Sequence, residues 1–487
     1  MAAFPSFAFD RFELDTFARR VTRDRQPLPV ADRHFDVLYC LVSHPGELLT
    51  KDALVTAGWG DVAVTDNSLE QAISALRRAL GPRADGSQYI ETIPRRGYRF
   101  TASPERKTAR ATDESLDALM APHRAWLEGR ASLETLEKDH IRRARRDFEQ
   151  VLEAFPDNAA AHVGLANALA MAFEMTRADT EPNREALASA RQHALEACRL
   201  DAGLGEAWAT LGFVLNCCGQ SGDALAAVRR AVTLESDNWR HHFRLGYIGW
   251  GEERLRAARK TLALLPGFPL AHWLAATVHV ARNVLDEAER ELRAGIAGQE
   301  AQGPHVRFTS VALHWLLGLV LLARGDEDGA LIEFERELAA EASGHLYARE
   351  CCSNTCYAIG ALRLRRQQKT EAQQAFAQAL ERVPNHRLVL MIMTADTRSN
   401  VGGGQGFPSV AVGEDGVLVP FDDRFGAAVA VDLMGQTSLA AQVLDGALSA
   451  APPGNAGWLV PVEPLLNVSA SPDVWAPVLA RLRTRAA

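Results

Sequence analysis

The sequence predicts a mainly α-helical protein of 487 residues, in which a small α+β domain precedes a long array of paired helices. Residues 65–100 combine an amphipathic helix with a short hairpin that has an arginine-rich tip. From about residue 121 onward, small residues recur at the spacing that antiparallel helix pairs require. Hydrophobic residues make up 47% of the chain and charged residues 23%, so both parts are able to bury a core.

The spacing of apolar residues predicts the first strands and the first helix. Residues 7–17 alternate apolar and polar side chains, as half-buried strands do, and residues 21–30 continue as a hairpin that prolines close. From Ala31 to Val42 the period becomes helical, and His44-Pro45-Gly46 ends that helix. We therefore expect two short strand pairs followed by a first helix.

Two further helices are expected before the hairpin. Thr50 is a suitable N-cap for a helix at Lys51–Ala57, and a loop that holds Trp59 follows it. A third helix runs to Leu80 and begins at a cap formed by Thr65 or Asp66. At about 100° per residue, the apolar side chains of this third helix share one face, which must cover the core. They are Leu69, Ala72, Ile73, Leu76 and Leu80.

The opposite face of the third helix carries Asn67, Gln71, Ser74 and Arg78. These side chains suit base edges in a major groove, where Asn or Gln pairs with adenine and Arg pairs with guanine. On this helix alone, a merely solvated polar face is an equally good interpretation. The hairpin at residues 89–100 favours DNA binding, because its tip places arginines where they meet a minor groove or phosphates.

The predicted DNA-binding residues lie on the third helix and on the hairpin, with Arg77 expected at phosphate. They are Asn67, Ser68, Gln71, Ser74, Arg77, Arg78, Arg95, Arg96 and Arg99. The chain has a formal net charge of −8, yet residues 74–101 hold six basic residues against Asp85 and Glu91. This local distribution matters more for DNA binding than the charge of the whole chain.

The segments "DNSLEQAISALRRALG" and "YIETIPRRGYRF", preceded by strands and two helices, resemble the OmpR/PhoB-type winged helix-turn-helix domain in its CadC/HilA-like branch. The resemblance covers about residues 7–102. It implies that residues 66–80 form the recognition helix and residues 94–99 the wing, and that the loop within Gly46–Gly60 is able to touch RNA polymerase. No receiver domain precedes the resemblance, so phosphorylation by a histidine kinase is not the expected input.

The repeat spacing resembles that of tetratricopeptide repeats. Gly212, Gly318 and Gly360 each stand where two helices of a pair approach closely, and a larger residue follows about one helix later. We divide the chain into a winged-helix domain, a linker, a repeat array, a Gly-rich irregular segment and a C-terminal helical repeat or cap. The respective residues are 1–102, 103–120, 121–390, 391–420 and 421–487.

Repeats of this kind stack into a solenoid whose inner surface binds a peptide or a partner. In the register adopted here, aromatic residues face that groove and suit an apolar peptide or a small ligand. They are Phe243, Tyr247, Trp250, Trp273, Trp315 and Tyr357. A register shift of one residue would instead send these rings into packing between repeats, and that alternative stays open.

Seven cysteines without a disulfide framework favour a reducing compartment, and neither a signal peptide nor an apolar membrane span is visible. We therefore expect a cytoplasmic protein that contacts no membrane. Cys351, Cys352 and Cys356 lack a matching ligand pair at zinc spacing, so no metal and no cofactor is expected. No catalytic motif stands out, and we expect no enzyme.

The leading interpretation is a one-component transcriptional regulator that binds double-stranded DNA, with RNA polymerase as a further candidate partner. The array would sense a ligand, a peptide or a partner protein, or it would form a homodimer. The alternative is a protein–protein interaction scaffold whose winged helix docks protein rather than DNA.

Overall fold

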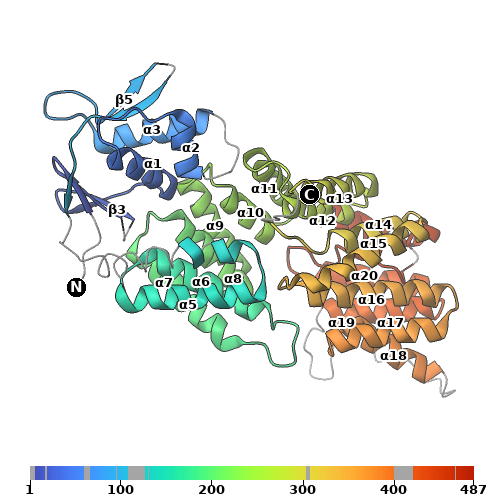
Figure 1. Ribbon diagram of the computed structural model, residues 1–487. Coiled ribbons are helices and arrows are strands. Elements are labelled where there is room, and N and C mark those ends of the chain that lie inside the picture. The colour runs from blue at the N-terminus through green and yellow to red at the C-terminus, as the bar shows by residue number, and fades with distance from the viewer. Residues whose placement is uncertain are drawn as a thin grey trace.

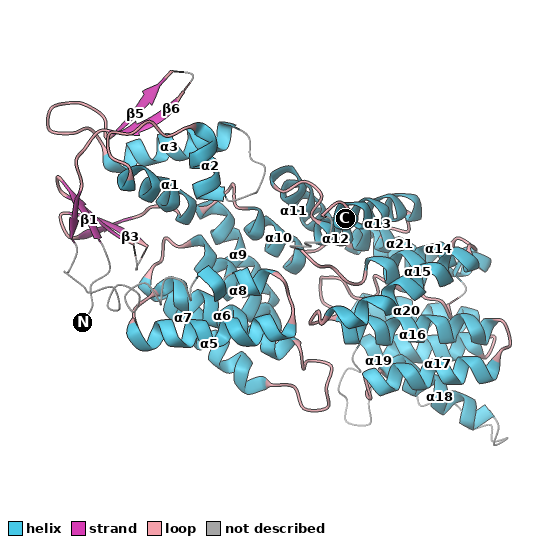
Figure 2. Cartoon of the chain, in the orientation of Figure 1, coloured by secondary structure: helices cyan, strands magenta, loops and turns pink. Residues whose placement is uncertain are grey.

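The computed structural model describes residues 6–16, 19–59, 66–94, 96–107, 127–129, 131–302, 308–399, 421–466 and 468–487. Figures 1 and 2 show a helical protein in which, among the described residues, the strands gather at the N-terminal end. The architecture is mainly α, with an N-terminal α+β winged helix-turn-helix and an α-helical repeat solenoid behind it.

The N-terminal sheet has the order β4-β3-β2-β1-β7, and its neighbouring strands pair antiparallel. The strands are β1 Ser6–Phe9, β2 Phe12–Asp15, β3 Arg20–Arg23, β4 Gln26–Leu28 and β7 Glu105–Lys107. The last strand corrects the sequence prediction, which began the linker at residue 103. Three residues are too few to show an alternation of apolar and polar side chains that would predict a strand. They form β7 because they pair with the free edge of β1.

Three helices and a hairpin complete this domain. They are α1 Asp32–Ser43, α2 Lys51–Trp59, α3 Asp66–Leu80, β5 Ile90–Ile93 and β6 Gly97–Phe100. Thr50 caps α2 as predicted, since its Oγ1 accepts the Ala53 N–H at 3.2 Å. Trp59 was expected in a loop, but it ends α2 and is buried in the domain core. The five apolar residues predicted for the inner face of α3 are all buried.

The array consists of helices that pair with their neighbours along the chain. Its main part comprises α5 Lys138–Ala154, α6 Ala159–Glu174, α7 Arg184–Leu200, α8 Gly205–Cys217, α9 Ser221–Leu234, α10 Trp239–Ile248, α11 Gly251–Leu264, α12 Pro269–Ala281, α13 Leu285–Glu300, α14 Leu313–Ala323, α15 Glu327–Ala339, η1 Ala340–Ser343, α16 Ala348–Arg365 and α17 Lys369–Arg382. A Cβ atom at Gly318 would lie 2.4 Å from the ring of Phe334, and one at Gly360 would lie 2.5 Å from Phe376. The small residues thus make room for large ones on the paired helix, which is the reason for the repeat spacing.

The C-terminal part contains α18 Arg387–Ser399, α19 Phe421–Leu433, α20 Thr437–Ala450, η2 Val460–Val462, η3 Val468–Ala470 and α21 Pro472–Arg485. The segment 391–420 was predicted to be irregular from its start, but α18 continues to Ser399. Its first turns bury Val389 and Ile392 against the core of the C-terminal helices, which stabilises the helix beyond the predicted boundary. The Gly-rich residues 400–420 lie outside the described residues.

The chain end returns to the middle of the array, as Figure 1 shows by the C label beside α12. The Arg282 guanidinium donates hydrogen bonds to the Ala486 carbonyl oxygen at 3.0 and 2.7 Å. The segment around η2 packs along α12 and α14. The solenoid is therefore closed by its own C-terminal residues.

Candidate nucleic-acid interface and repeat cavity

The outer face of α3 is open. Gln71, Ser74 and Arg78 are exposed, whereas Ser68 is half-buried. Asn67 lies within α3, but its side chain is outside the described residues. The burial of the opposite face in the domain core fixes the rotation of the helix, so the polar side chains point outward. The structure thus brings together the three central residues of the predicted base-reading face.

The wing is the β5–β6 hairpin, and its position depends on Gly97. This residue has φ +144°, and a Cβ atom there would lie 1.9 Å from the Leu49 carbonyl oxygen. The close approach lets Tyr98 and Leu49 exchange two backbone hydrogen bonds of 2.9 Å, which tie the wing to the loop before α2. The close backbone contact with Leu49 therefore requires glycine at this position.

The arginines of the wing differ in their surroundings. Arg96 is exposed near the tip, and Arg95 lies outside the described residues. The Arg99 guanidinium lies 2.7 Å from the Glu91 carboxylate, its cross-strand neighbour. Both side chains of this pair are more than two-fifths exposed, so water weakens the attraction between them. Arg99 is therefore able to exchange Glu91 for another anionic partner.

Arg77 connects α3 to the wing. Its Nε and Nη2 donate to the Ile90 carbonyl oxygen at 2.9 and 2.7 Å, and Nη2 also donates to Thr92 Oγ1 at 2.7 Å. The sequence predicts this residue at phosphate, and in the structure its guanidinium donates to β5. Arg77 therefore sets the orientation of the wing relative to the helix.

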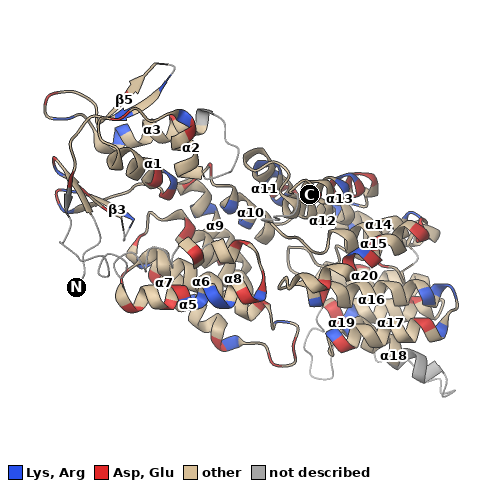
Figure 3. Cartoon of the chain, viewed as in Figure 1, with Lys and Arg blue, Asp and Glu red and all other residues tan. Residues whose placement is uncertain are grey.

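Basic residues are concentrated on these same elements. Figure 3 shows Lys and Arg in blue on α3 and on the hairpin that contains β5. Within the described residues, Arg78 and Arg96 are exposed and take part in no ion pair of 4 Å or less. Two cations that protein carboxylates do not neutralise are available to an anionic partner.

The domain contacts the array through α1, on the side away from the wing (Figure 1). Arg33 donates to the Asp237 carbonyl oxygen at 3.1 Å and to Asn238 Oδ1 at 3.3 Å, at the turn between α9 and α10. Leu265 of the array packs against the core of the domain. This contact leaves the outer face of α3 and the wing uncovered.

The array contains an aromatic cavity of about 280 Å³ on its inner side. Helices α8, α10 and α12 supply the floor, and the segments around residues 133–136, 308–312 and 345–351 surround it. Its aromatic lining consists of Phe213, Trp239, Phe243, Tyr247, Phe268, Trp273, Phe308 and Tyr347. Three arginines, Arg177, Arg240 and Arg244, interrupt this apolar surface.

In the structure, the six aromatic residues predicted for the groove lie in three different surroundings. Phe243, Tyr247 and Trp273 line the cavity. Trp315 and Tyr357 are buried beside the C-terminal segment: the Trp315 ring lies 6.5 Å from that of Trp458, and Tyr357 Oη donates to Glu463 Oε1 at 2.5 Å. The chain itself thus covers this part of the groove.

The sixth of these residues, Trp250, lies at the start of α11. The Arg254 guanidinium stacks over its ring at 4.6 Å from the centroid. The ring packs against the cluster that includes Leu255 and Ala486, near the chain end. Trp250 is therefore part of the packing between α11 and the C-terminus.

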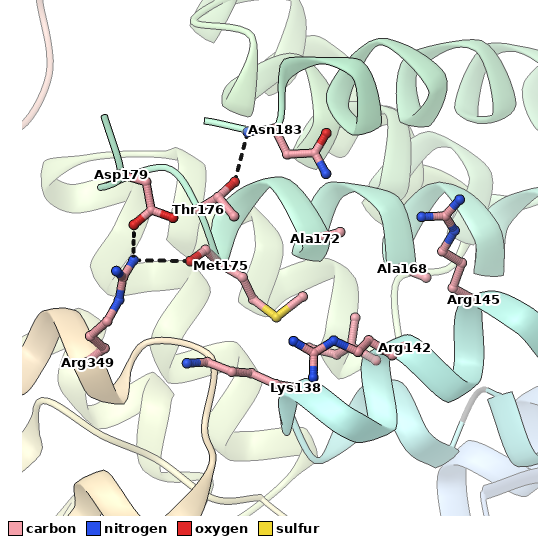
Figure 4. Close-up of a pocket in the computed structure, with 11 residues that line it drawn as sticks. Lys138, Arg142, Arg145, Ala168, Ala172, Met175, Thr176, Asp179, Asn183 and Arg349 are labelled. Carbon is pink, nitrogen blue, oxygen red and sulfur yellow. Dashed lines mark hydrogen bonds and ion pairs between the residues drawn. The ribbon is translucent and has the colours of Figure 1, made fainter. Parts of the chain in front are cut away.

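A second cavity, of about 450 Å³, lies along α5 and α6 (Figure 4). Lys138, Arg142 and Arg145 border it from α5, and Arg349 reaches it from α16. Arg349 is paired with Asp179 at 2.5 Å. Arg142 and Arg145 are paired within α5, with Asp139 at 2.7 Å and Glu149 at 2.8 Å. The cations of this cavity are thus largely neutralised.

Several lining residues of the aromatic cavity escaped the sequence analysis. Phe268 and Phe308 lie in loops, and Trp239 and Arg244 stand on the same helix as the predicted Phe243. The helical period would have indicated Trp239, four residues before Phe243, and Arg244, three residues before Tyr247. The loop residues have no such signal, because they meet the cavity only when helices distant in the sequence assemble.

The described residues include no group of three or more His, Cys, Asp or Glu side chains arranged for a metal ion. None of the described helices combines the length and the apolar character that crossing a membrane requires.

Comparison with known proteins identifies both parts. Residues 25–100 match the family described as "Transcriptional regulatory protein, C terminal", and residues 131–204 match a tetratricopeptide repeat family. The transcriptional regulator HilA of Salmonella typhimurium is 35% identical over 94 residues, which are 19% of this chain and 17% of HilA. The transcriptional activator CadC of Escherichia coli is 35% identical over 82 residues, which are 17% of this chain and 16% of CadC.

The solved DNA-binding domain of Escherichia coli CadC is 28% identical, with a TM-score of 0.20, and the match covers 22% of this chain and 99% of that domain. The matched segments span about a sixth of the length of HilA and of CadC. The descriptions of the two matched families name a transcriptional regulatory protein and a tetratricopeptide repeat, and neither names an enzyme. The chain therefore carries an N-terminal OmpR/PhoB-type domain, similar to those of HilA and CadC, and tetratricopeptide repeats follow it.

Proposed function

We propose that this protein is a sequence-specific DNA-binding transcriptional regulator. Helix α3 inserts into the major groove, and the wing at residues 94–99 lies over a minor groove or along phosphates. The observation that carries the proposal is the open face of Gln71, Ser74 and Arg78 beside an exposed Arg96. The match of residues 25–100 to a transcriptional regulatory family, and the similarity of the chain to two transcription regulators over 94 and 82 residues, support it.

Specificity and affinity come from different side chains in this arrangement. Gln71 and Arg78 carry donors that suit adenine and guanine edges. The wing arginines, Arg95, Arg96 and Arg99, neutralise phosphates, which supplies affinity without sequence preference. Arg77 acts indirectly, because its three hydrogen bonds to β5 hold the wing in place for this contact. Asn67 and Ser68 stand at the start of α3, where helix N–H groups and short side chains favour phosphate contacts.

The remaining parts of the chain serve regulation in this proposal. The DNA-binding unit extends through β7 to Lys107, and the array from about residue 131 receives a ligand, a peptide or a second copy of the chain. The loop between α1 and α2 is exposed at Glu47 and hydrogen-bonded to β6, so it is available to RNA polymerase while the wing is on DNA.

The test is selection of binding sites from a random duplex library with the full-length protein, followed by mobility shifts on the selected duplex. We expect Arg78→Ala to lose preference at one or two base pairs by about 1–3 kcal/mol. Arg20→Ala is the matched control, because Arg20 is an exposed arginine on β3, away from α3.

A wild-type protein that enriches no sequence, or an Arg78→Ala protein that keeps the wild-type preference, would contradict this use of α3. The scaffold alternative would be favoured if the wild-type protein enriched no sequence but bound a protein partner, and if Arg78→Ala released that partner.

A further inference from the structure

The aromatic cavity of the array is built to hold a ring system. Phe268 is the centre of a cluster in which its ring centroid lies 4.9 Å from Trp239, 5.1 Å from Phe243 and 5.1 Å from Phe308. These contacts fix the rings before any ligand arrives, so a planar guest meets preformed walls at little entropic cost. The mainly apolar lining with a few polar groups is of the kind that small-molecule sites have, and the volume of about 280 Å³ suits a small guest.

The charges in the cavity are unevenly compensated. Arg177 lies 3.0 Å from the carboxylates of both Glu174 and Glu350. Arg240 is paired with Glu134. Arg244, by contrast, has no carboxylate of the described residues within 4 Å. The Glu206 carboxylate acts on Arg244 only from beyond ion-pair distance. The cavity therefore contains one guanidinium that has no direct carboxylate partner among the described residues.

Arg244 is held in position by neutral groups. Its Nη2 donates to Asn167 Oδ1 at 2.6 Å, and its guanidinium stacks over Phe213 at 4.5 Å from the ring centroid. Asn167 is itself fixed, since its Nδ2 donates to Thr210 Oγ1 at 2.8 Å and to the Val163 carbonyl oxygen at 3.1 Å. Burial lowers the pKa of Arg244, and the group still stays charged because arginine starts from so high a value. A fixed cation without a direct carboxylate partner in a largely apolar cavity attracts an anion.

We propose that this cavity binds a small organic anion with an aromatic body, whose rings lie among Trp239, Phe243, Phe268 and Trp273 and whose charged group pairs with Arg244. The guanidinium offers free N–H groups for a carboxylate or sulfonate in charge-assisted hydrogen bonds. A neutral aromatic compound would gain the ring contacts alone, and a polar anion without rings would leave the walls unfilled.

The cavity lies next to the contact with the DNA-binding domain. Trp239 and Arg240 line the cavity and directly follow Asp237 and Asn238, which accept the hydrogen bonds of Arg33. A ligand that shifts the first turn of α10 acts on this contact, and the anion is then the effector of the regulator. Only this regulatory role rests on the proposed function, since binding in the cavity does not require DNA.

The experiment uses two probes with the same rings. The anion 8-anilinonaphthalene-1-sulfonate and the neutral N-phenyl-1-naphthylamine are titrated into the full-length protein, and their fluorescence gives two dissociation constants. In Arg244→Met, which keeps the length of the side chain, we expect the sulfonate to bind roughly tenfold or more weakly. The neutral probe should keep its affinity within about twofold.

Arg229→Met is the matched control, because Arg229 is a mostly exposed arginine on α9 that is paired with Glu253 away from the cavity. It should leave both probes unchanged, and circular dichroism checks that both variants keep the wild-type helical content. Equal sulfonate affinity in the wild type and Arg244→Met, or an equal loss for both probes, would overturn the assignment. Mobility shifts on the selected duplex form a separate arm, so a failure of DNA binding is told apart from a failure of this site.

Discussion

The two parts of this molecule place their candidate functional side chains on opposite sides of their folds. In the winged helix, Gln71, Ser74 and Arg78 point outward from a helix whose other face is the core. In the array, Phe243 and Arg244 point inward, into a cavity that distant segments close. The first arrangement suits a partner much larger than the domain, and the second suits one that the protein surrounds.

The two candidate sites also depend on different parts of the structure. The outer face of α3 needs only the helical period and a local core, so it is a property of one short segment. The cavity needs the repeats to stack in register, because residues 308–312 and 345–351 reach it from other helix pairs. Damage to repeat packing should therefore affect the cavity and leave the DNA-binding surface intact.

The largest expected effect concerns the packing of the array. Phe334 is completely buried on α15 against Gly318, and Phe334→Ala should lower the free energy of unfolding of the array by about 3–5 kcal/mol. Urea denaturation followed by circular dichroism measures it. Ile332→Ala on the same helix is the control, because Ile332 is 52% exposed and its removal should cost well under 1 kcal/mol. Equal losses for both variants would mean that the assigned packing of α15 is wrong.

The second effect concerns the wing. Arg95→Ala together with Arg96→Ala should weaken binding to every duplex, selected or random, by roughly tenfold to a hundredfold at low salt. The slope of the logarithm of affinity against the logarithm of salt concentration should also become shallower by about 1–2. Loss of affinity for the selected duplex alone would show that the wing reads bases rather than phosphates.

A smaller effect distinguishes two neighbours on α3. Arg78→Ala should cost about 1–3 kcal/mol and only at particular base pairs, whereas Arg77→Ala should weaken binding to all duplexes by releasing the wing. Competition with single-base variants of the selected duplex measures both. If Arg77→Ala alters preference at one base and leaves random DNA unaffected, Arg77 contacts the base edges itself.

The smallest effect is a pH dependence inside the array. Burial lowers the pKa of His386 to about 4, below its unfolded value of about 6.5, and its neutral ring contacts Asn354. Between these values the unfolded chain binds a proton that the folded chain does not, so stability falls as the pH falls from about 6.5 to 4. The free energy of unfolding should therefore fall less between pH 7 and pH 5 in His386→Gln than in the wild type, by about 1–2 kcal/mol.

Thermal or urea unfolding at pH 7 and pH 5 gives the two free energies for each protein. His140→Gln, a histidine substitution at a half-exposed position of α5, is measured in the same way for comparison. A wild-type difference between the two pH values that His386→Gln does not reduce would contradict the assignment to His386.

Much of the fold was predictable because its signals are local. The apolar face of α3, the cap at Thr50 and the small-to-large pairing of Gly318 with Phe334 are each set within one helix or one pair. Long-range contacts escaped prediction. The strand β7 exists through the edge of β1, and the C-terminal segment that covers Trp315 meets it from more than a hundred residues away.

The candidate site follows the same rule. The sequence predicted the exposed polar face of α3, yet it could not tell that Arg77 turns toward Ile90, since that depends on where the hairpin folds back. In the array it selected Phe243 by repeat register but missed Phe308, which approaches from a loop. Helical period predicts the direction of a side chain, and only tertiary contacts decide what that side chain meets.

The most direct test of the central claim is a salt titration of the full-length protein on its selected duplex by mobility shift. The account predicts that affinity falls by at least about tenfold between roughly 50 and 200 mM salt, and that the Arg95→Ala, Arg96→Ala protein shows a weaker dependence. Affinity that does not change with salt, or that the double variant retains in full, would contradict DNA binding by this surface.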